Sequence, residues 1–276
     1  MKKIIVAMDF SKGANNALNY AIDIALNANS EILLLWVDTR IDGFAPGGKN
    51  EERQDAKLEL KSIISAKTEE HQGLEMSYKL RKGKVYQELA LQAASCNTDL
   101  IIVGTHGIGG FEEFWVGSNA FKIISYAPCP VISVRTDFSK EGNIKSIVLP
   151  IDDSFDTTKK VPMAAKLALA FNAEIQVLAI YYSELASLKK LTDTNIKETK
   201  RFLVGKGVIT KYKTCLSNNV STSIVKFAEN NSADLIVIMT DQDKASKDIL
   251  MGINSQQIIN RSSIPILSVK PDKLEF

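Results

Sequence analysis

The sequence has little of several features that would define a specialised class of protein. Only three of its 276 residues are cysteines, Cys96, Cys129 and Cys215, and they are widely spaced with no CxxC pair. This pattern argues against a disulfide scaffold or a thiolate metal site, and a reducing cytoplasm fits it best. The longest apolar runs, such as 32–37, have the length of a strand and fall short of the roughly 18 residues of a membrane helix. We therefore expect a cytoplasmic protein with no membrane partner.

Net charge is also nearly absent. The chain has 34 Lys and Arg against 32 Asp and Glu, a net charge of +2, which gives no electrostatic footprint for nucleic acid. Hydrophobic residues make up 45% and charged residues 24%, so disorder, collagen and coiled coil are excluded. At roughly 100–200 residues per domain, the length indicates two domains.

What the sequence does contain is one unit in two copies. IIVAMDFS at 4–11 matches IVLPIDDS at 147–154, at an offset of 143 residues. Further along, DLIIVGTHG from Asp99 matches DLIVIMTDQ from Asp234, at an offset of 135 residues. The second copy has therefore lost eight residues between these points. A repeat of this length indicates two domains of the same fold.

Each copy alternates β-branched runs with amphipathic stretches of period 3.6, which is typical of βα units around a parallel sheet. Right-handed crossovers then predict an α/β fold with two tandem open doubly wound five-stranded sheets and helices on both faces. The polar segment 136–143 predicts a linker, giving domains 1–138 and 144–276. The expected strands are 3–8, 31–37, 75–81, 99–104 and 130–135, then 145–151, 174–181, 208–213, 234–239 and 264–269; the expected helices of the first copy are 14–28, 51–70, 85–95 and 117–126.

Two segments of the first copy predict a ligand site. Open α/β sheets bind ligands beyond the carboxyl ends of their strands, where residues 7–9 and the loop 104–119, GTHGIGGFEEFWVGSN, both lie. The loop glycines allow positive φ and close backbone approach, so main-chain N–H groups can form an anion nest. Residues 117–119 open the next helix, whose free N–H groups favour a phosphate. Such loops and caps also occur in α/β connections that bind nothing.

The spacing within this loop is specific. Gly104, Gly107, Gly117 and Ser118 follow Gly-x2-Gly-x9-Gly-Ser, and together with Asp9 after the first strand they resemble the universal stress protein family. In that family the pattern marks the ATP-binding branch. Because the resemblance covers both copies, the chain is similar to a tandem universal stress protein, whose five-stranded parallel sheets have the order 3-2-1-4-5.

The resemblance implies a cofactor and a set of residues that bind it. The cofactor would be ATP, or AMP or ADP, with Mg²⁺ as an optional companion. His106 lies in the same loop, where its imidazole could hydrogen-bond a phosphate. The family often has proline at position 7, but alanine keeps the backbone groups available. The adenosine side would be lined by Ala7, Met8 and Asp9 with Val37 at adenine, and the ribose and phosphates would be held by Gly104, Gly107, Gly117, Ser118 and Asn119. Val103 is a further expected cofactor-binding residue.

The second copy lacks this pattern. The offset of 135 places Met239 at Gly104 and Ile253 at Ser118, which predicts a degenerate second domain without an equivalent site. The retained Asp152 then has a turn or helix-cap role. In the family two such domains commonly pair through their last strands, which implies intramolecular pairing of the two domains and leaves further homodimerisation open.

Three functions are consistent with the sequence. The first is an adenine-nucleotide-binding stress-response regulator or sensor. The second is a slow ATP hydrolase or nucleotidyl-transfer enzyme, which would need a base and a metal ligand not identified beyond Asp9 and His106. The third is a nucleotide-free dimeric interaction module. With no Gly-x4-Gly-Lys-Ser/Thr loop in the chain, we assign no catalytic or metal-ligating residue and favour the first function.

Overall fold

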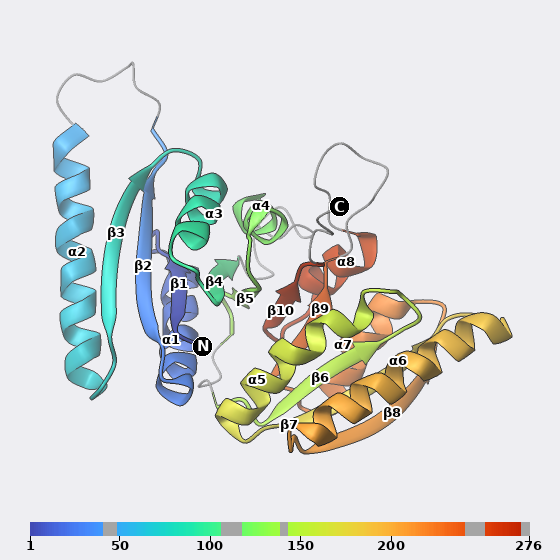
Figure 1. Ribbon diagram of the computed structural model, residues 1–276. Coiled ribbons are helices and arrows are strands. Elements are labelled where there is room, and N and C mark those ends of the chain that lie inside the picture. Colours follow the sequence, from blue (N-terminus) through green and yellow to red (C-terminus); the bar gives the residue numbers. More distant parts are fainter. Residues whose placement is uncertain (41–48, 106–117, 139–142, 241–251, 272–276) are drawn as a thin grey trace. The chain divides into compact units, whose positions relative to one another are not determined.

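In a computed structural model the two sequence copies form two separate units, Met1–Gly142 and Asn143–Phe276 (Figure 1). The structure describes residues 1–40, 49–105, 118–138, 143–240 and 252–271. Each unit is an α/β domain. None of the helices within these ranges combines the length and the apolar composition needed to cross a membrane.

The first unit is built on a parallel sheet whose central strands are apolar on both faces. Ile4, Ile5 and Val6 in the first strand are fully buried, as is typical of parallel strands covered by helices on either side. The strand order is β3-β2-β1-β4-β5, with all pairs parallel. The elements are β1 (Lys3–Ala7), α1 (Lys12–Ala28), β2 (Glu31–Asp38), α2 (Lys49–Glu70), β3 (Met76–Lys82), α3 (Val85–Ser95), β4 (Leu100–Thr105), α4 (Ser118–Tyr126) and β5 (Val131–Arg135).

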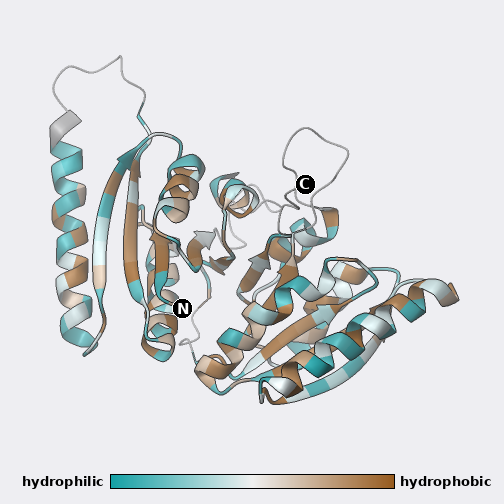
Figure 2. Ribbon diagram, in the orientation of Figure 1, coloured by the Kyte–Doolittle hydropathy of each residue, from teal (hydrophilic) through white to brown (hydrophobic). Residues whose placement is uncertain are grey.

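The helices of this unit follow from local sequence. Ser11 caps α1 because its Oγ accepts a hydrogen bond from the Ala14 N–H at 3.2 Å. The same helix ends at Asn29 in the left-handed conformation, φ 49°. Helices α3 and α4 pack against each other, while α2 is largely polar (Figure 2). Right-handed crossovers place α1 and α2 on the opposite face of the sheet from α3 and α4.

The second unit repeats the topology with the order β8-β7-β6-β9-β10, all parallel. The predicted fold of two tandem five-stranded doubly wound sheets is confirmed. Strand β8 lies further along the chain than expected: it covers 210–216 instead of 208–213, because its pairing with β7 runs from Ile175↔Thr210 to Tyr181↔Leu216. The elements are β6 (Ser146–Ile151), η1 (Thr157–Lys160), α5 (Val161–Phe171), β7 (Glu174–Tyr181), α6 (Ala186–Gly205), β8 (Thr210–Leu216), α7 (Val220–Asn230), β9 (Leu235–Met239), α8 (Ile253–Arg261) and β10 (Ile266–Val269).

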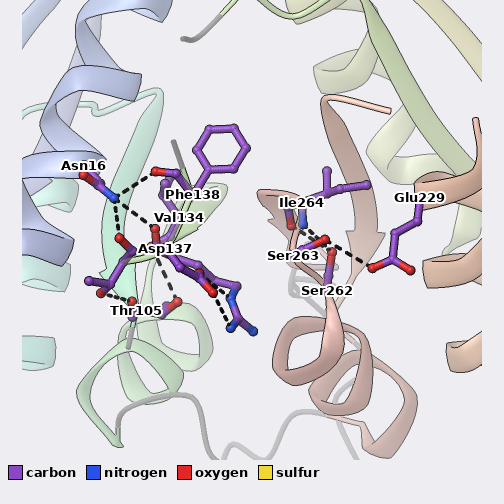
Figure 3. A network of polar contacts seen from close by, with 11 residues as sticks. Asn16, Thr105, Val134, Asp137, Phe138, Glu229, Ser262, Ser263 and Ile264 are labelled. Atoms are coloured by element: carbon purple, nitrogen blue, oxygen red, sulfur yellow. Dashed lines mark hydrogen bonds and ion pairs between the residues drawn. The ribbon is translucent and has the colours of Figure 1, made fainter. Parts of the chain in front are cut away.

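The beginning of the predicted linker 136–143 is anchored on the first unit. The Asn16 amide in α1 donates to the backbone carbonyls of Thr136 at 2.8 Å and of Phe138 at 3.0 Å (Figure 3). The Tyr20 and Phe138 rings also meet edge to face, with centroids 5.8 Å apart. Residues as far as Phe138 therefore pack as part of the first unit.

Candidate functional site

A cavity of about 360 Å³ opens at the carboxyl edge of the first sheet. It lies where β1 pairs with β2 on one side and β4 on the other, and where the connections from β1 and β4 leave on opposite faces. This is the topological switch point, at which open α/β sheets bind their ligands. The lining residues are Ala7, Met8, Asp9, Ser11, Gly13, Ala14, Leu35, Trp36, Val37, Thr39, Val85, Val103, Gly104, Thr105, Asn119, Ala120, Ile123 and Thr136.

The structure brings together most of the expected site residues that it describes. Three others, His106, Gly107 and Gly117, lie outside the described residues, and Ser118 is described only as the first residue of α4. Two lining residues that the sequence analysis did not predict are Trp36, which precedes Val37 in β2, and Thr39, which follows the end of β2. Only their position near the end of the strand could have indicated them. The expected residues that line the cavity are Ala7, Met8, Asp9, Val37, Val103, Gly104 and Asn119.

The turn between β1 and α1 is held by Asp9 and carries a strained residue. One carboxylate oxygen of Asp9, Oδ1, accepts a hydrogen bond from the Ser11 N–H at 3.0 Å. Between them Phe10 has φ 63°, in the left-handed region that bulky residues rarely occupy. Such a conformation costs about 1–3 kcal/mol and is concentrated at ligand sites. The positive φ of Phe10 was not predicted, because positive φ was considered only at glycines.

Gly104 lies where two backbone segments of the first unit come into close contact. A Cβ at Gly104 would lie 2.3 Å from the carbonyl carbon and oxygen of Gly13 and 2.7 Å from the Ala14 nitrogen. Its φ is outside the left-handed region. The end of β4 therefore touches the first turn of α1, backbone to backbone, and Gly104 permits this internal contact. Of the two properties that the sequence suggested for the loop glycines, positive φ and close backbone approach, Gly104 shows the second.

Val37 presents backbone groups to the cavity. The pairing of β1 with β2 ends at Ala7↔Leu35, and the Met8 N–H donates to the Leu35 carbonyl at 2.9 Å. In a parallel sheet alternate residues direct both backbone groups to the same neighbour, so Val37 faces the side of β1 just beyond the last pair. No hydrogen bond joins Val37 to β1 among the described residues. A backbone donor and acceptor are thus placed side by side on the cavity wall.

The charged groups beside the cavity are largely matched in pairs. Arg40 holds Asp38 through two bonds, Nε to Oδ1 at 2.9 Å and Nη2 to Oδ2 at 3.0 Å, and this lowers the pKa of Asp38. Arg135 holds Asp137 in the same bidentate way at 2.9 and 3.0 Å and lowers the pKa of Asp137. Unlike Asp38 and Asp137, Asp9 is one of the described residues that line the cavity.

The described residues offer little for metal or thiol chemistry. Over that part of the chain no three His, Cys, Asp or Glu side chains gather to hold a metal ion. Burial raises the pKa of the Cys129 thiol to about 12, so it is not a thiolate at neutral pH.

In the corresponding turn of the second unit, the polar groups hydrogen-bond to one another. Asp152 Oδ1 accepts from the Ser154 N–H at 3.1 Å and from the Ser154 hydroxyl at 2.7 Å, so the predicted turn role is confirmed. The Asn195 amide donates to the Asp152 carbonyl at 2.8 Å. Nearby, the buried Lys160 ammonium donates to the Thr157 carbonyl at 2.8 Å and to its hydroxyl at 3.0 Å. Burial alone would raise the pKa of Asp152. The positive charge of Lys160 and the hydrogen bonds from Ser154 outweigh the effect of burial, so the pKa of Asp152 is lowered.

Comparisons with known proteins agree with this architecture. A sequence model of the Universal stress protein family matches residues 1–135 and again 143–270. A putative universal stress protein of Staphylococcus haemolyticus is 28% identical over 182 residues, covering 54% of this chain and 93% of that protein. The crystal structure of a universal stress protein from Archaeoglobus fulgidus covers 98% of both chains with a TM-score of 0.81 at 16% identity. A putative universal stress protein from Pseudomonas aeruginosa covers 99% of this chain and 94% of that chain with a TM-score of 0.70 at 18% identity. Since the family model matches both copies, the chain belongs to the universal stress protein family, of which it carries two domains in tandem.

Proposed function

We propose that the first domain binds an adenine nucleotide in the switch-point cavity and that the chain acts as a nucleotide-dependent stress-response regulator. The observation that carries this proposal is the backbone donor and acceptor of Val37 on the wall of a cavity of about 360 Å³. This volume lies in the range of about 300–1,000 Å³ typical of small-molecule sites. Universal stress protein membership supports the regulatory role.

The pair of groups at Val37 suits the edge of adenine. The N6 amine of adenine donates a hydrogen bond and its neighbouring N1 accepts one, which complements a carbonyl and an N–H on one residue. Asp9 uses one hydrogen bond to hold its turn, and a carboxylate can accept about four, so it can also accept a ribose hydroxyl. The phosphates would extend toward the first turn of α4, whose free N–H groups favour anions. ATP, AMP or ADP, with or without Mg²⁺, fits this arrangement.

Replacing Val37 by proline tests the site directly. Val37→Pro removes the N–H that would meet adenine, and we expect affinity for ATP to fall by roughly tenfold or more, since one buried hydrogen bond is worth about 1–3 kcal/mol. Calorimetric titration should show one site per chain in the unaltered protein. Val37→Ala is the matched control, because it shortens the same side chain and keeps the backbone N–H, and it should leave the affinity nearly unchanged.

Two results would count against the site. A folded Val37→Pro protein with unaltered affinity would exclude adenine recognition at this residue. If Val37→Pro unfolds, Asn119→Leu tests the site from a different element, the first turn of α4. Unaltered ATP affinity in Asn119→Leu would show that the phosphates do not bind at this turn.

The assembly of the chain is a separate proposal. Family resemblance implies that the two domains pair within one chain, which predicts a monomer. Light scattering should then return the chain mass of 30.4 kDa, with and without ATP. A mass near twice that value would instead support homodimerisation.

A further inference from the structure

Thr136 joins three parts of the cavity wall. It follows β5 directly, begins the connection between the two copies and lines the cavity. Its backbone N–H and its hydroxyl both donate to the Thr105 carbonyl at the end of β4, at 2.9 Å and 2.7 Å. The same hydroxyl lies against the first turn of α1, because a Cβ built at Gly13 would be 2.9 Å from Thr136 Oγ1. The start of the connection is therefore part of the cavity wall.

One side-chain amide holds the residues around this point. The Asn16 amide donates to three backbone carbonyls (Figure 3), those of Thr136 at 2.8 Å, Phe138 at 3.0 Å and Arg135 at 3.3 Å. An amide group has two hydrogens, so the three carbonyls share them. The Tyr20 ring adds an edge-to-face contact with Phe138. We call these contacts of α1 with residues 135–138 the Asn16 clamp.

The Asn16 clamp has few buried contacts. Asp137 is exposed, and Thr136 and Phe138 are half-buried. Segments of this kind open locally at the low end of the free energies found within a protein. Opening would carry Thr136 away from Thr105 and remove part of the cavity wall. A ligand that binds the complete wall therefore favours the docked state of residues 136–138 over the open one.

The second copy has different residues at both key positions. The repeat offsets place Pro271 at the position of Thr136, and proline has neither the N–H nor the hydroxyl with which Thr136 binds the end of β4. Lys159 stands at the position of Asn16, and its ammonium contacts Asp156 at 2.8 Å. The shared topology therefore does not require the Asn16 clamp. The clamp occurs in the copy that has both the cavity and the connection.

Binding in the cavity can thus be passed to the connection between the copies. We infer that a nucleotide in the cavity fixes residues 136–138 on α1, so that occupancy sets the residue at which the connection leaves the first domain; this inference rests on the proposed function. Coupling between two such events is reciprocal and typically about 5–150-fold. Bound nucleotide should lower the open fraction of the Asn16 clamp, and opening of the clamp should weaken nucleotide binding by the same factor.

Hydrogen exchange of the full chain, with and without saturating ATP, measures this coupling. The Thr136 N–H donates to the Thr105 carbonyl and the Phe138 N–H to the Arg135 carbonyl, so exchange of both amides reports on opening. We expect peptides that span 136–138 to exchange at least about fivefold more slowly with ATP.

Asn16→Ala removes the amide of the clamp and leaves every described lining residue in place. In this variant the effect of ATP on residues 136–138 should shrink to less than about twofold, because these residues are then largely open with or without ATP. ATP should still slow exchange in β1 and β4. Asn19→Ala is the matched control, since Asn19 lies in the same helix with an exposed side chain and its loss should leave the effect of ATP unchanged.

A second variant keeps the test valid if Asn16→Ala does not fold. Phe138→Ala removes the ring contact with Tyr20 from the side of the connection and should reduce the effect of ATP on residues 136–138 in the same direction.

The outcomes separate the inference from the function on which it rests. If ATP slows exchange in β1 and β4 but not in 136–138, or slows 136–138 equally in the clamp variant and the unaltered protein, the coupling is wrong and nucleotide binding still stands. If ATP slows exchange in none of these segments and calorimetry shows no binding, both the proposed function and the inference fail.

Discussion

The turn from β1 into α1 and the turn from β6 into α5 start from the same aspartate and lead into different helices. In the first domain Asp9 orients Ser11, and Ser11 caps α1, which begins at Lys12. In the second domain Asp152 binds Ser154 twice, and the chain passes through a 3₁₀ turn before α5 begins at Val161. The helix therefore starts six residues later in the repeat register. One retained residue supports an open cavity in one copy and a closed polar turn in the other.

The difference between the copies depends on which groups meet the end of the central strand. Gly104 lets β4 touch the backbone of α1, whereas its repeat partner Met239 is a buried large side chain. In the second domain Lys160, only 3% exposed, stands at the repeat position of the fully buried Ala17. Lys160 thus gives the second domain a buried ammonium group that acts on Asp152, at a repeat position where the first domain has a buried alanine.

The largest effect should come from Gly104→Ala. Its Cβ would overlap the Gly13 backbone, which cannot rotate away as a side chain can, so we expect domain 1 to lose about 3 kcal/mol or more of unfolding free energy. Guanidinium denaturation measures this loss. Gly205→Ala in α6 is the matched control, since its Cβ would meet nothing within 4 Å, and it should stabilise by about 0.5 kcal/mol. Equal midpoints for both variants would disprove the tight contact.

Saturating nucleotide should stabilise the first domain and leave the second unchanged. At a ligand concentration of 100 times Kd the native state gains about 2.7 kcal/mol of free energy. Hydrogen exchange with peptide resolution should therefore slow in β1, β4 and α1 and stay constant in β6, β9 and α5. Equal slowing in both domains would mean that the second copy also binds nucleotide. The difference between the two turns would then not explain which domain binds it.

Removing the buried ammonium should destabilise only the second domain. Lys160→Met leaves the Asp152 carboxylate without its cation, at an expected cost of about 2 kcal/mol because Asp152 is only partly buried. Lys159→Met, at the neighbouring and less buried position, should change stability by less than about 0.5 kcal/mol.

The pH dependence of this cost gives a check that packing alone would not produce. Since the pKa of Asp152 is lowered in the folded state, its ionisation stabilises the domain above the ordinary pKa of 3.8, and that stabilisation is lost as pH falls through the lowered value. The difference between Lys160→Met and the unaltered protein should therefore shrink below pH 4. A difference that stays constant down to pH 2 would point to packing instead of charge.

The smallest effect should come from the helix cap. Ser11→Ala removes the side-chain acceptor for the Ala14 N–H and should cost about 1 kcal/mol in domain 1. Ser154→Ala, at the same repeat position, removes a hydroxyl that bonds Asp152 and caps no helix, so helix stability in domain 2 should be unaffected. Loss of exchange protection in the first turn of α1, without a matching loss in α5, is the expected pattern.

The strands and the two repeated sheets could be predicted, because both follow from patterns among residues that are close in the sequence. Apolar runs and helical periodicity located the strands within a few residues, and the repeat offset predicted both sheets. The reason for Gly104 was not predictable, because its contact Gly13 is far away in the chain. The strained φ of Phe10 and the burial of Lys160 likewise result from tertiary packing, which overrides residue preference. Of the candidate site, the strand ends could be predicted and the cavity wall contributed by α1 could not.

Trp36, on the cavity wall, has a practical consequence. The chain has two tryptophans, Trp36 and Trp115, and both belong to the first copy. Indole emission therefore reports on the first domain alone, while far-ultraviolet circular dichroism reports on the helices of both. A single intact sample followed by these two signals can separate the unfolding of one copy from that of the other, without cutting the chain.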